Sequence, residues 1–151
     1  MDSVLWMLDD GTDEATKQML HHLIERKKKL DKLHKKQMFF LSLFFLYTIL
    51  FIYLFYKKLL IPYSDSAFQI ISSFFDSRMM MILLLAGAGL LGAVKIFRDQ
   101  KDKAEAEFHA LRCEIIDKSK DLWKNDAWEN RHKIFEMMER KFGINLYHES
   151  K

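Results

Sequence analysis

Four residues with metal-binding side chains lie in two stretches that have helical spacing. His109 and Cys113 are four residues apart, so both side chains would lie on one face of a helix, and His21 and His22 belong to the stretch expected to pair with it. A structural zinc site normally needs four such ligands in recognisable clusters. These residues do not form such clusters, so we interpret them as a surface histidine and a packed cysteine and expect no metal ion and no cofactor.

Gly87, Gly89 and Gly92 have the spacing of a dinucleotide-binding turn, but they lie inside a long apolar run. That turn needs a preceding strand and a soluble βαβ unit, so the match is interpreted as accidental. Ala88 with Gly92, and Gly89 with Ala93, are four residues apart, and each pair would make a flat strip that another helix can approach closely. The partner would be the first apolar helix of the same chain or the same strip of a second copy. A helix that merely tolerates glycine is the remaining alternative.

No group of residues has the composition of a catalytic site. The acidic residues stand among lysines at helical spacing, which is typical of a solvated helix face. The 24 Lys and Arg residues are nearly matched by 21 Asp and Glu residues, which argues against bulk nucleic-acid binding. We therefore expect neither an enzyme nor a nucleic-acid-binding protein, and no small-molecule substrate is evident.

A run of basic residues precedes the first long apolar block. Near a membrane surface, each charge would attract anionic lipid headgroups by about 1 kcal/mol. The same charges can also orient a membrane helix without any further role, so both interpretations stay open. The candidate headgroup-binding residues are Arg26, Lys27, Lys28, Lys29, Lys32, Lys35 and Lys36.

The apolar residues are pooled in two blocks, while the charged residues, 30% of the chain, crowd into the rest. Residues 38–56 are 19 in a row without a charge, and residues 59–61 extend the run. Residues 79–94 are 16 uncharged residues, and Ile96 and Phe97 lengthen them beyond a snorkelling Lys95. Roughly 20 apolar residues cross a hydrocarbon core about 30 Å thick. The sequence therefore predicts a lipid bilayer as partner and two transmembrane helices, residues 38–61 and 79–97.

The distribution of basic residues predicts the orientation of this hairpin. Basic residues are dense before the first block and after the second, and sparse in the connecting loop, which has Lys57, Lys58 and Arg78. By the positive-inside bias, both termini are cytoplasmic and the loop is external, in the cell (plasma) membrane.

Within the loop, Pro62 is expected to end the first helix, and Ser66 with Gln69 makes a capping box for a short amphipathic helix. That helix would lie along the outer membrane interface, or it would run directly into the second membrane helix. Its apolar side chains are Phe68, Ile71, Phe74 and Phe75.

The two charged ends are predicted to continue the membrane helices, because neither junction contains a proline or a turn cluster. Apolar residues recur there in steps of three and four, interrupted by Arg26, Lys101 and Lys118, which predicts an antiparallel helical stalk. A further helix ending near Phe142, before Gly143, is predicted to fold back on the stalk. The stalk positions are Met19, Leu23, Leu30 and Leu33 in the first arm and Phe97, Ala104, Phe108, Leu111, Ile115 and Leu122 in the second.

The predicted fold is therefore all-α, a two-helix transmembrane hairpin extended by cytoplasmic helices that form a small helical bundle or a coiled-coil stalk. The predicted segments are a cytoplasmic N-terminal arm (1–37), transmembrane helix 1 (38–61), an external loop with a short amphipathic helix (62–78), transmembrane helix 2 (79–97), a cytoplasmic arm (98–124), and a C-terminal helix and tail (125–151).

This layout resembles that of the YpbF-like family of small bacterial membrane proteins. The likeness is carried by the charged first helix, the Phe-rich first span, the short loop, the Gly-rich second span, and the charged tail with Trp123 and Trp128. The resemblance implies the plasma membrane of a Gram-positive bacterium and a family of unknown function, and it carries over no site residues.

The sequence favours a non-enzymatic, membrane-anchored scaffold or interaction protein. Its partner would be a second copy of the chain or another protein, bound through the cytoplasmic helices or the small-residue strip. The alternative is a small oligomeric channel or an accessory subunit of a transporter. It is disfavoured because neither predicted span has an ionisable residue in its central part.

Overall fold

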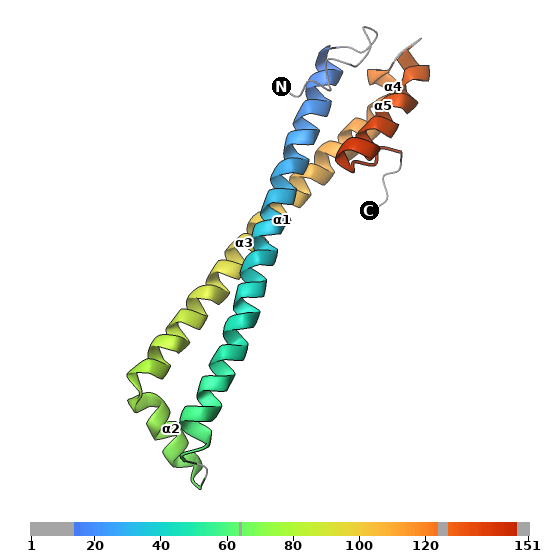
Figure 1. Cartoon of the computed structure of the whole chain (residues 1–151). Helices are drawn as coiled ribbons and strands as arrows, with labels where there is room; N and C mark the ends of the chain where they lie inside the picture. The colour runs from blue at the N-terminus through green and yellow to red at the C-terminus, as the bar shows by residue number, and fades with distance from the viewer. Residues whose placement is uncertain (1–13, 64, 124–126, 148–151) are drawn as a thin grey trace. The chain divides into compact units, whose positions relative to one another are not determined.

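The computed structural model describes residues 14–63, 65–123 and 127–147, and within these ranges every regular element is a helix. The all-α prediction is confirmed for this part of the chain. The elements, shown in Figure 1, are α1 (Glu14–Phe55), the π-helix η2 (Tyr56–Leu60), α2 (Ala67–Asp76), α3 (Arg78–Asp117), α4 (Ser119–Leu122) and α5 (Ala127–Phe142).

The chain divides into two compact units, and α1 and α3 contribute to both. The terminal unit comprises residues 1–32 and 101–151, and the central unit comprises residues 33–100. As predicted, α1 and α3 each continue without interruption from one unit to the other. The reason is local, since no proline or glycine stands at either junction to break the ladder of helical hydrogen bonds.

The terminal unit has an apolar core of its own. Leu20, Leu23 and Ile24 of α1 are at most 1% exposed. Fully burying a side chain of this size stabilises a fold by about 1.5 to 3 kcal/mol, so these residues contribute to the stability of the unit. Of the predicted stalk positions, Leu23, Leu30, Ala104, Phe108 and Ile115 are buried, and Met19, Leu33, Phe97, Leu111 and Leu122 are half-buried. The other buried hydrophobic residues in the described part of this unit are Leu20, Ile24, Trp123, Ile134, Phe135, Met138, Ile144 and Leu146.

Helix α5 returns alongside α3 in the opposite direction, as predicted (Figure 1). The Trp123 and Phe135 rings pack edge to face with centroids 5.5 Å apart. Farther from this turn, the buried Arg112 donates from Nε to the carbonyl oxygen of Asn145 at 2.7 Å. Helix α5 ends at Phe142, where Gly143 has a φ of 65°. The side chain of Trp128 lies outside the described part of the structure.

The charged residues that interrupt the stalk pattern each have a local explanation. Arg26 donates to the backbone carbonyl of Glu107 at 2.8 Å, so it links α1 to α3. The Lys101 ammonium lies 2.5 Å from the Glu105 carboxylate, and this hydrogen bond raises the pKa of Lys101. Lys118 stands in the turn that ends α3. Charge at these positions therefore stays at the surface of the bundle.

In the central unit, α1 and α3 run antiparallel and touch through aromatic side chains. The Phe40 and Phe97 rings stack with centroids 4.7 Å apart. Farther along, the Tyr47 hydroxyl donates a hydrogen bond to the carbonyl oxygen of Leu83. As residue numbers rise in α1, those of its contacts in α3 fall, so the two segments form a helical hairpin.

The hairpin turns through η2 and α2. The Ile61 N–H donates to the Tyr56 carbonyl at 3.1 Å, five residues back, and the helical segment ends at Leu60, just before Pro62 as predicted. Ser66 occupies the predicted N-cap position of α2 with extended backbone (φ −148°, ψ 116°). Its side chain makes no capping hydrogen bond, so the capping-box prediction is correct in position and wrong in that bond.

Helix α2 is separate from α3, so it does not run directly into the second long apolar helix, one of the two alternatives left open by the sequence. Ser77, the residue between them, has extended backbone with a ψ of 101°. Its N–H donates to the Ser73 carbonyl at 3.1 Å, and its hydroxyl lies 3.5 Å from the Met80 nitrogen. Ser77 thus caps the end of one helix and the start of the next.

Candidate functional site

The most unusual feature of the molecule is the apolar surface of the central unit. Among the residues that the structure describes, 24 large hydrophobic residues are exposed; 23 of them lie between Met38 and Ile96, and Tyr147 lies in the terminal unit. Within the central unit, the buried hydrophobic residues among those described are Leu59 and Met80. A monomeric protein in water rarely exposes a contiguous apolar surface of this extent, so this surface is a candidate site of interaction.

Two helical segments are long and apolar enough to cross a membrane, by length and composition alone: Glu14–Leu60 and Arg78–Asp117. The most apolar stretch of the first segment is 0% buried, and that of the second is 6% buried. A core helix of a water-soluble protein passes the same test of composition, but its apolar stretch is mostly buried. The exposure of both stretches therefore disfavours a soluble core.

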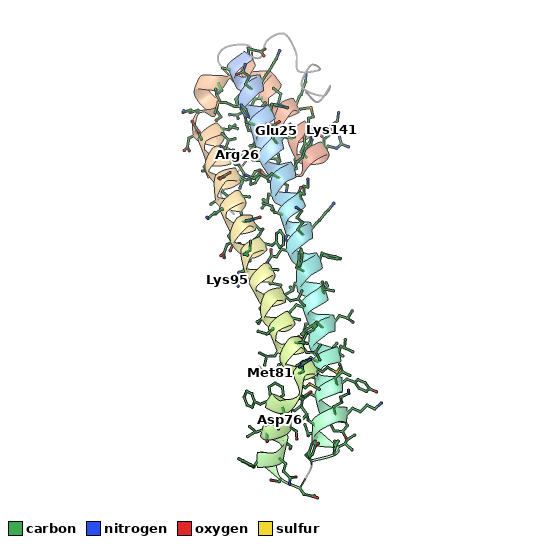
Figure 2. The ribbon with its side chains drawn as sticks, turned by 90° about the vertical axis from the view of Figure 1, so that its left-hand side faces the viewer. Glu25, Arg26, Asp76, Met81, Lys95 and Lys141 are labelled. Atoms are coloured by element: carbon green, nitrogen blue, oxygen red, sulfur yellow. The ribbon has the colours of Figure 1, made fainter. Side chains whose placement is uncertain are left out.

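Basic residues bound the apolar surface at both of its ends. Lys36 of α1 precedes the uncharged segment and Lys57 of η2 follows it, an interval of roughly 30 Å at 1.5 Å per residue. In α3, Arg78 and Lys95 enclose a segment of roughly 25 Å. Figure 2 shows the α3 side chains between Met81 and Lys95 drawn almost entirely as carbon. These lengths are close to the hydrocarbon thickness of a bilayer, about 30 Å.

Several of the seven basic residues before this surface contact their own chain. In the terminal unit, Arg26 donates to the Glu107 carbonyl, Lys29 lies 3.8 Å from the Glu107 carboxylate, and Lys27 lies 3.0 Å from Asp31. Lys28 also has a partner. In the central unit, Lys36 lies over the Phe97 ring, 5.9 Å from its centre. Lys32 and Lys35 are exposed.

The small residues of α3 differ in whether they contact α1. A Cβ atom built on Gly87 would lie 3.0 Å from the Tyr47 ring, so Gly87 is the glycine that admits α1. Cβ atoms on Gly89 and Gly92 would meet no described atom within 4 Å. Ala88, Gly89 and Gly92 are exposed, and Ala93 is half-buried. Gly89 and Gly92 therefore do not serve the pairing of α1 with α3.

The family described as "protein of unknown function (DUF2663)" matches residues 19–149. The uncharacterized protein YpbF of Bacillus subtilis (strain 168) is 36% identical to this chain over 154 aligned residues, covering 100% of both chains. The chain belongs to this family. The resemblance found in the sequence is thereby confirmed. No solved structure matches this member of the DUF2663 family.

The three histidines considered as metal ligands contact carboxylates in this family member, and Cys113 is a half-buried free cysteine. His21 and His22 lie 3.4 and 3.6 Å from the Glu25 carboxylate, and His109 lies 4.0 Å from Glu105. Within the described ranges, no group of three or more His, Cys, Asp and Glu residues is placed to hold a metal ion. These histidines are accounted for by helical pairs at the surface.

Sequence reasoning missed the contact between Tyr47 and Gly87. Tyr47 lies inside an apolar run, where a hydroxyl must find a partner, and that requirement was an available signal. The partner is the Leu83 carbonyl, one helical turn before Gly87. The spacing of the glycines alone did not distinguish Gly87 from Gly89.

Proposed function

We propose that this protein is a two-span membrane protein whose terminal unit is a non-enzymatic helical module held at the cytoplasmic surface. The observation that carries the proposal is the contrast between the units. The terminal unit buries Leu20, Leu23 and Ile24 as a protein in water does, whereas the central unit leaves 23 large apolar residues exposed. One chain with two such surfaces is suited to two solvents.

Hydrogen bonding supports a bilayer as the second solvent. Inside hydrocarbon, every backbone group must be satisfied within the protein, which a helix achieves by itself. The apolar parts of α1 and α3 are continuous helix. Thr48 and Tyr47, which have hydroxyls in this region, both donate to backbone carbonyls, those of Phe44 and Leu83. These polar groups are thus compatible with lipid.

The balance of basic residues supports cytoplasmic termini. Charged residues flank the apolar surface at both ends, but the side that leads into the terminal unit has the larger number of lysines and arginines. Lys32 and Lys35, exposed at this side, remain candidates for anionic headgroups, at about 1 kcal/mol for each charge near the surface.

An interaction role follows from what the two units offer. The terminal unit presents exposed charges of both signs, including Lys29 and Glu107, on a bundle that α1 and α3 fix to the membrane. The strip of Ala88, Gly89 and Gly92 faces away from α1 and would let a second copy approach closely. We propose protein partners at both surfaces, a second copy at the strip and another protein at the bundle.

The topology is tested by labelling single cysteines with a membrane-impermeant maleimide in intact cells. In a Cys113→Ala background, Gln69→Cys is expected to react in intact cells and Lys103→Cys only after permeabilisation; both positions are exposed. The reverse pattern would invert the orientation. Release of the chain from membranes by alkaline carbonate would overturn the proposal of two spans.

Self-association is tested by oxidative crosslinking in native membranes. In the same background, Gly89→Cys is expected to give a dimer, and Leu91→Cys, which is also exposed on α3 but lies on a different face of the helix, serves as the control. Equal yields at the two positions would contradict a specific strip. Ion flux through liposomes that contain the purified chain would instead favour a small channel.

A further inference from the structure

Only part of the apolar surface of helix α2 is covered by other residues of the chain. Phe74 is half-buried, and its ring lies 6.1 Å from that of Phe55 in α1. Phe68, Ile71 and Phe75 share a neighbouring face, and they are 78%, 57% and 65% exposed. The adjoining face on its other side is polar, with Gln69, Ser72 and Asp76 exposed, and Ser72 stands one helical turn after Phe68.

The position of α2 restricts what can cover this face. Contact between Phe74 and Phe55 ties α2 to the end of α1, and Ser77 alone separates α2 from α3. The apolar surfaces of α1 and α3 continue to the same place, where Ile61, Met79 and Ile82 are exposed. Whatever covers the apolar surface of the central unit therefore also reaches the open face of α2.

The polar groups of α2 favour a boundary with water on one side. Ser72 lies 3.4 Å from the Asp76 carboxylate, and both are exposed. A carboxylate at this position would be costly inside hydrocarbon, whereas three large apolar side chains would be costly in water. A helix that lies in the plane of the membrane interface satisfies both groups.

We propose that α2 is an interfacial helix that binds the bilayer leaflet at which the hairpin turns. Phe68, Ile71 and Phe75 enter the boundary between headgroups and acyl chains, while Gln69, Ser72 and Asp76 face water. This inference rests on the proposed membrane insertion of α1 and α3. The extended backbone at Ser77 makes it possible, because it lets α2 leave the direction of α3.

Because the backbone break at Ser77 lets α2 lie in the membrane interface, α2 would also hold the hairpin at a fixed depth. A helix seated at the interface resists movement of the hairpin along the membrane normal, since its apolar face would enter water in one direction and its polar face would enter hydrocarbon in the other. Helix α2 would thus fix how deeply α1 and α3 sit, and with them the position of the terminal unit relative to the membrane surface.

The test is a scan of α2 with single nitroxide spin labels in the full chain. The protein, with Cys113→Ala, is reconstituted in liposomes of phosphatidylcholine and phosphatidylglycerol, and relaxation is measured with oxygen, which enters bilayers, and with a water-soluble nickel chelate. The ratio of oxygen to nickel accessibility is expected to be several-fold higher at positions 68, 71 and 75 than at positions 69 and 76, with an intermediate value at position 72, which borders Phe68 and Phe75 on the helix. The helical period is the signature that a disordered or fully submerged loop would not give.

Further labels at positions 49 and 85, which are exposed residues of α1 and α3, separate this inference from the proposed function. If these two labels are in lipid and all six α2 labels are equally accessible to nickel, the interfacial helix is wrong while the two spans stand. If labels 49 and 85 are themselves accessible to nickel, the membrane proposal fails. Exclusion of both reagents at positions 68, 71 and 75 would identify protein, such as a second copy, as the covering surface and would overturn a lipid occupant.

Discussion

At the scale of single residues, the contact between Tyr47 and Gly87 determines how closely α1 and α3 approach in the central unit. The Tyr47 ring occupies the space where any other residue at position 87 would place its Cβ atom, 3.0 Å away. Its hydroxyl then reaches the Leu83 carbonyl. Absence of a side chain at Gly87 is thus a condition for both the packing and the hydrogen bond.

Gly87→Leu is therefore expected to destabilise the helical pair by about 1 to 3 kcal/mol, the usual cost of overfilling a packed site. Unfolding of the purified chain in mixed micelles by increasing amounts of SDS, followed by circular dichroism, measures the change. Ala86→Leu is the matched control, since Ala86 is exposed on α3 and lies outside the small-residue strip. Equal losses for the two variants would contradict the assigned contact.

In the terminal unit, a hydrogen bond from Arg112 likewise joins two segments of the chain. It is 6% exposed, and its Nε donates to the Asn145 carbonyl at 2.7 Å. Arg112→Met keeps the apolar stem and removes the donor, so the free energy of unfolding should fall by about 2 kcal/mol, typical of a hydrogen bond to a charged group. Urea unfolding in detergent measures it. Arg140→Met is the control, because the exposed Arg140–Glu136 pair should contribute no more than about 0.5 kcal/mol; a comparable loss there would contradict the prediction.

Residue spacing along one helix could be read from the sequence, whereas contacts between α1 and α3 could not. Spacing indicated Ala88, Gly89, Gly92 and Ala93 as candidates for close packing, whereas the glycine that contacts α1 is Gly87. Spacing could not tell which glycine faces α1, because that depends on where Tyr47 lies in the partner helix. The same holds for Arg26: in the sequence it interrupts an apolar pattern, and only the position of the Glu107 carbonyl explains it.

At the scale of elements, the end of α5 governs the packing of the segment that follows it. Gly143 has a φ of 65°, its N–H donates to the Glu139 carbonyl at 2.9 Å, and the Ile144 N–H donates to the Met138 carbonyl at 3.1 Å. This turn brings Ile144 and Leu146 into the core, where they are 0% and 1% exposed.

Gly143→Ala should lower the free energy of unfolding of the terminal unit by about 1 kcal/mol, because a residue with a Cβ atom resists positive φ. Gly143→Asn should cost clearly less, since asparagine tolerates the left-handed conformation. Thermal unfolding of both variants in detergent distinguishes them. An alanine variant as stable as the natural protein would mean that the turn is not held in this conformation.

The long helices were predictable because their signals are repeated along many residues. The uncharged run from residue 38 to 56 and the three- and four-residue steps in the arms each indicate helix, and nothing at the junctions opposes it. The π-helix at Tyr56–Leu60 and the break at Ser77 span only a few residues, and no repeated pattern in the sequence marks them. Leu20 and Ile24 are buried although they lie outside the predicted three- and four-residue pattern.

At the scale of the whole molecule, the same physical rule gives opposite arrangements in the two units. Water drives apolar side chains inward, and the terminal unit follows this with Leu23, Phe108 and Met138 in its core. Lipid removes that drive, so a helix pair in a bilayer is held by close packing and by hydrogen bonds such as that of Tyr47 to Leu83. In the proposed bilayer, the exposed leucines and phenylalanines of the central unit would be in their preferred solvent.

An exposed leucine in the central unit provides the sharpest test of this division. Leu85 is 66% exposed. If it faces water, Leu85→Asp should change stability by less than about 0.5 kcal/mol and improve solubility. If it faces hydrocarbon, the aspartate should raise the free energy of insertion by about 3 kcal/mol, and the carbonate-resistant membrane fraction of the chain should fall. We expect the second result, and for Ala110→Asp, at an exposed position of α3 in the terminal unit, we expect no change in that fraction. Two substitutions on one continuous helix would then respond differently only because their solvents differ, whereas an unchanged membrane fraction for Leu85→Asp would place the central unit in water.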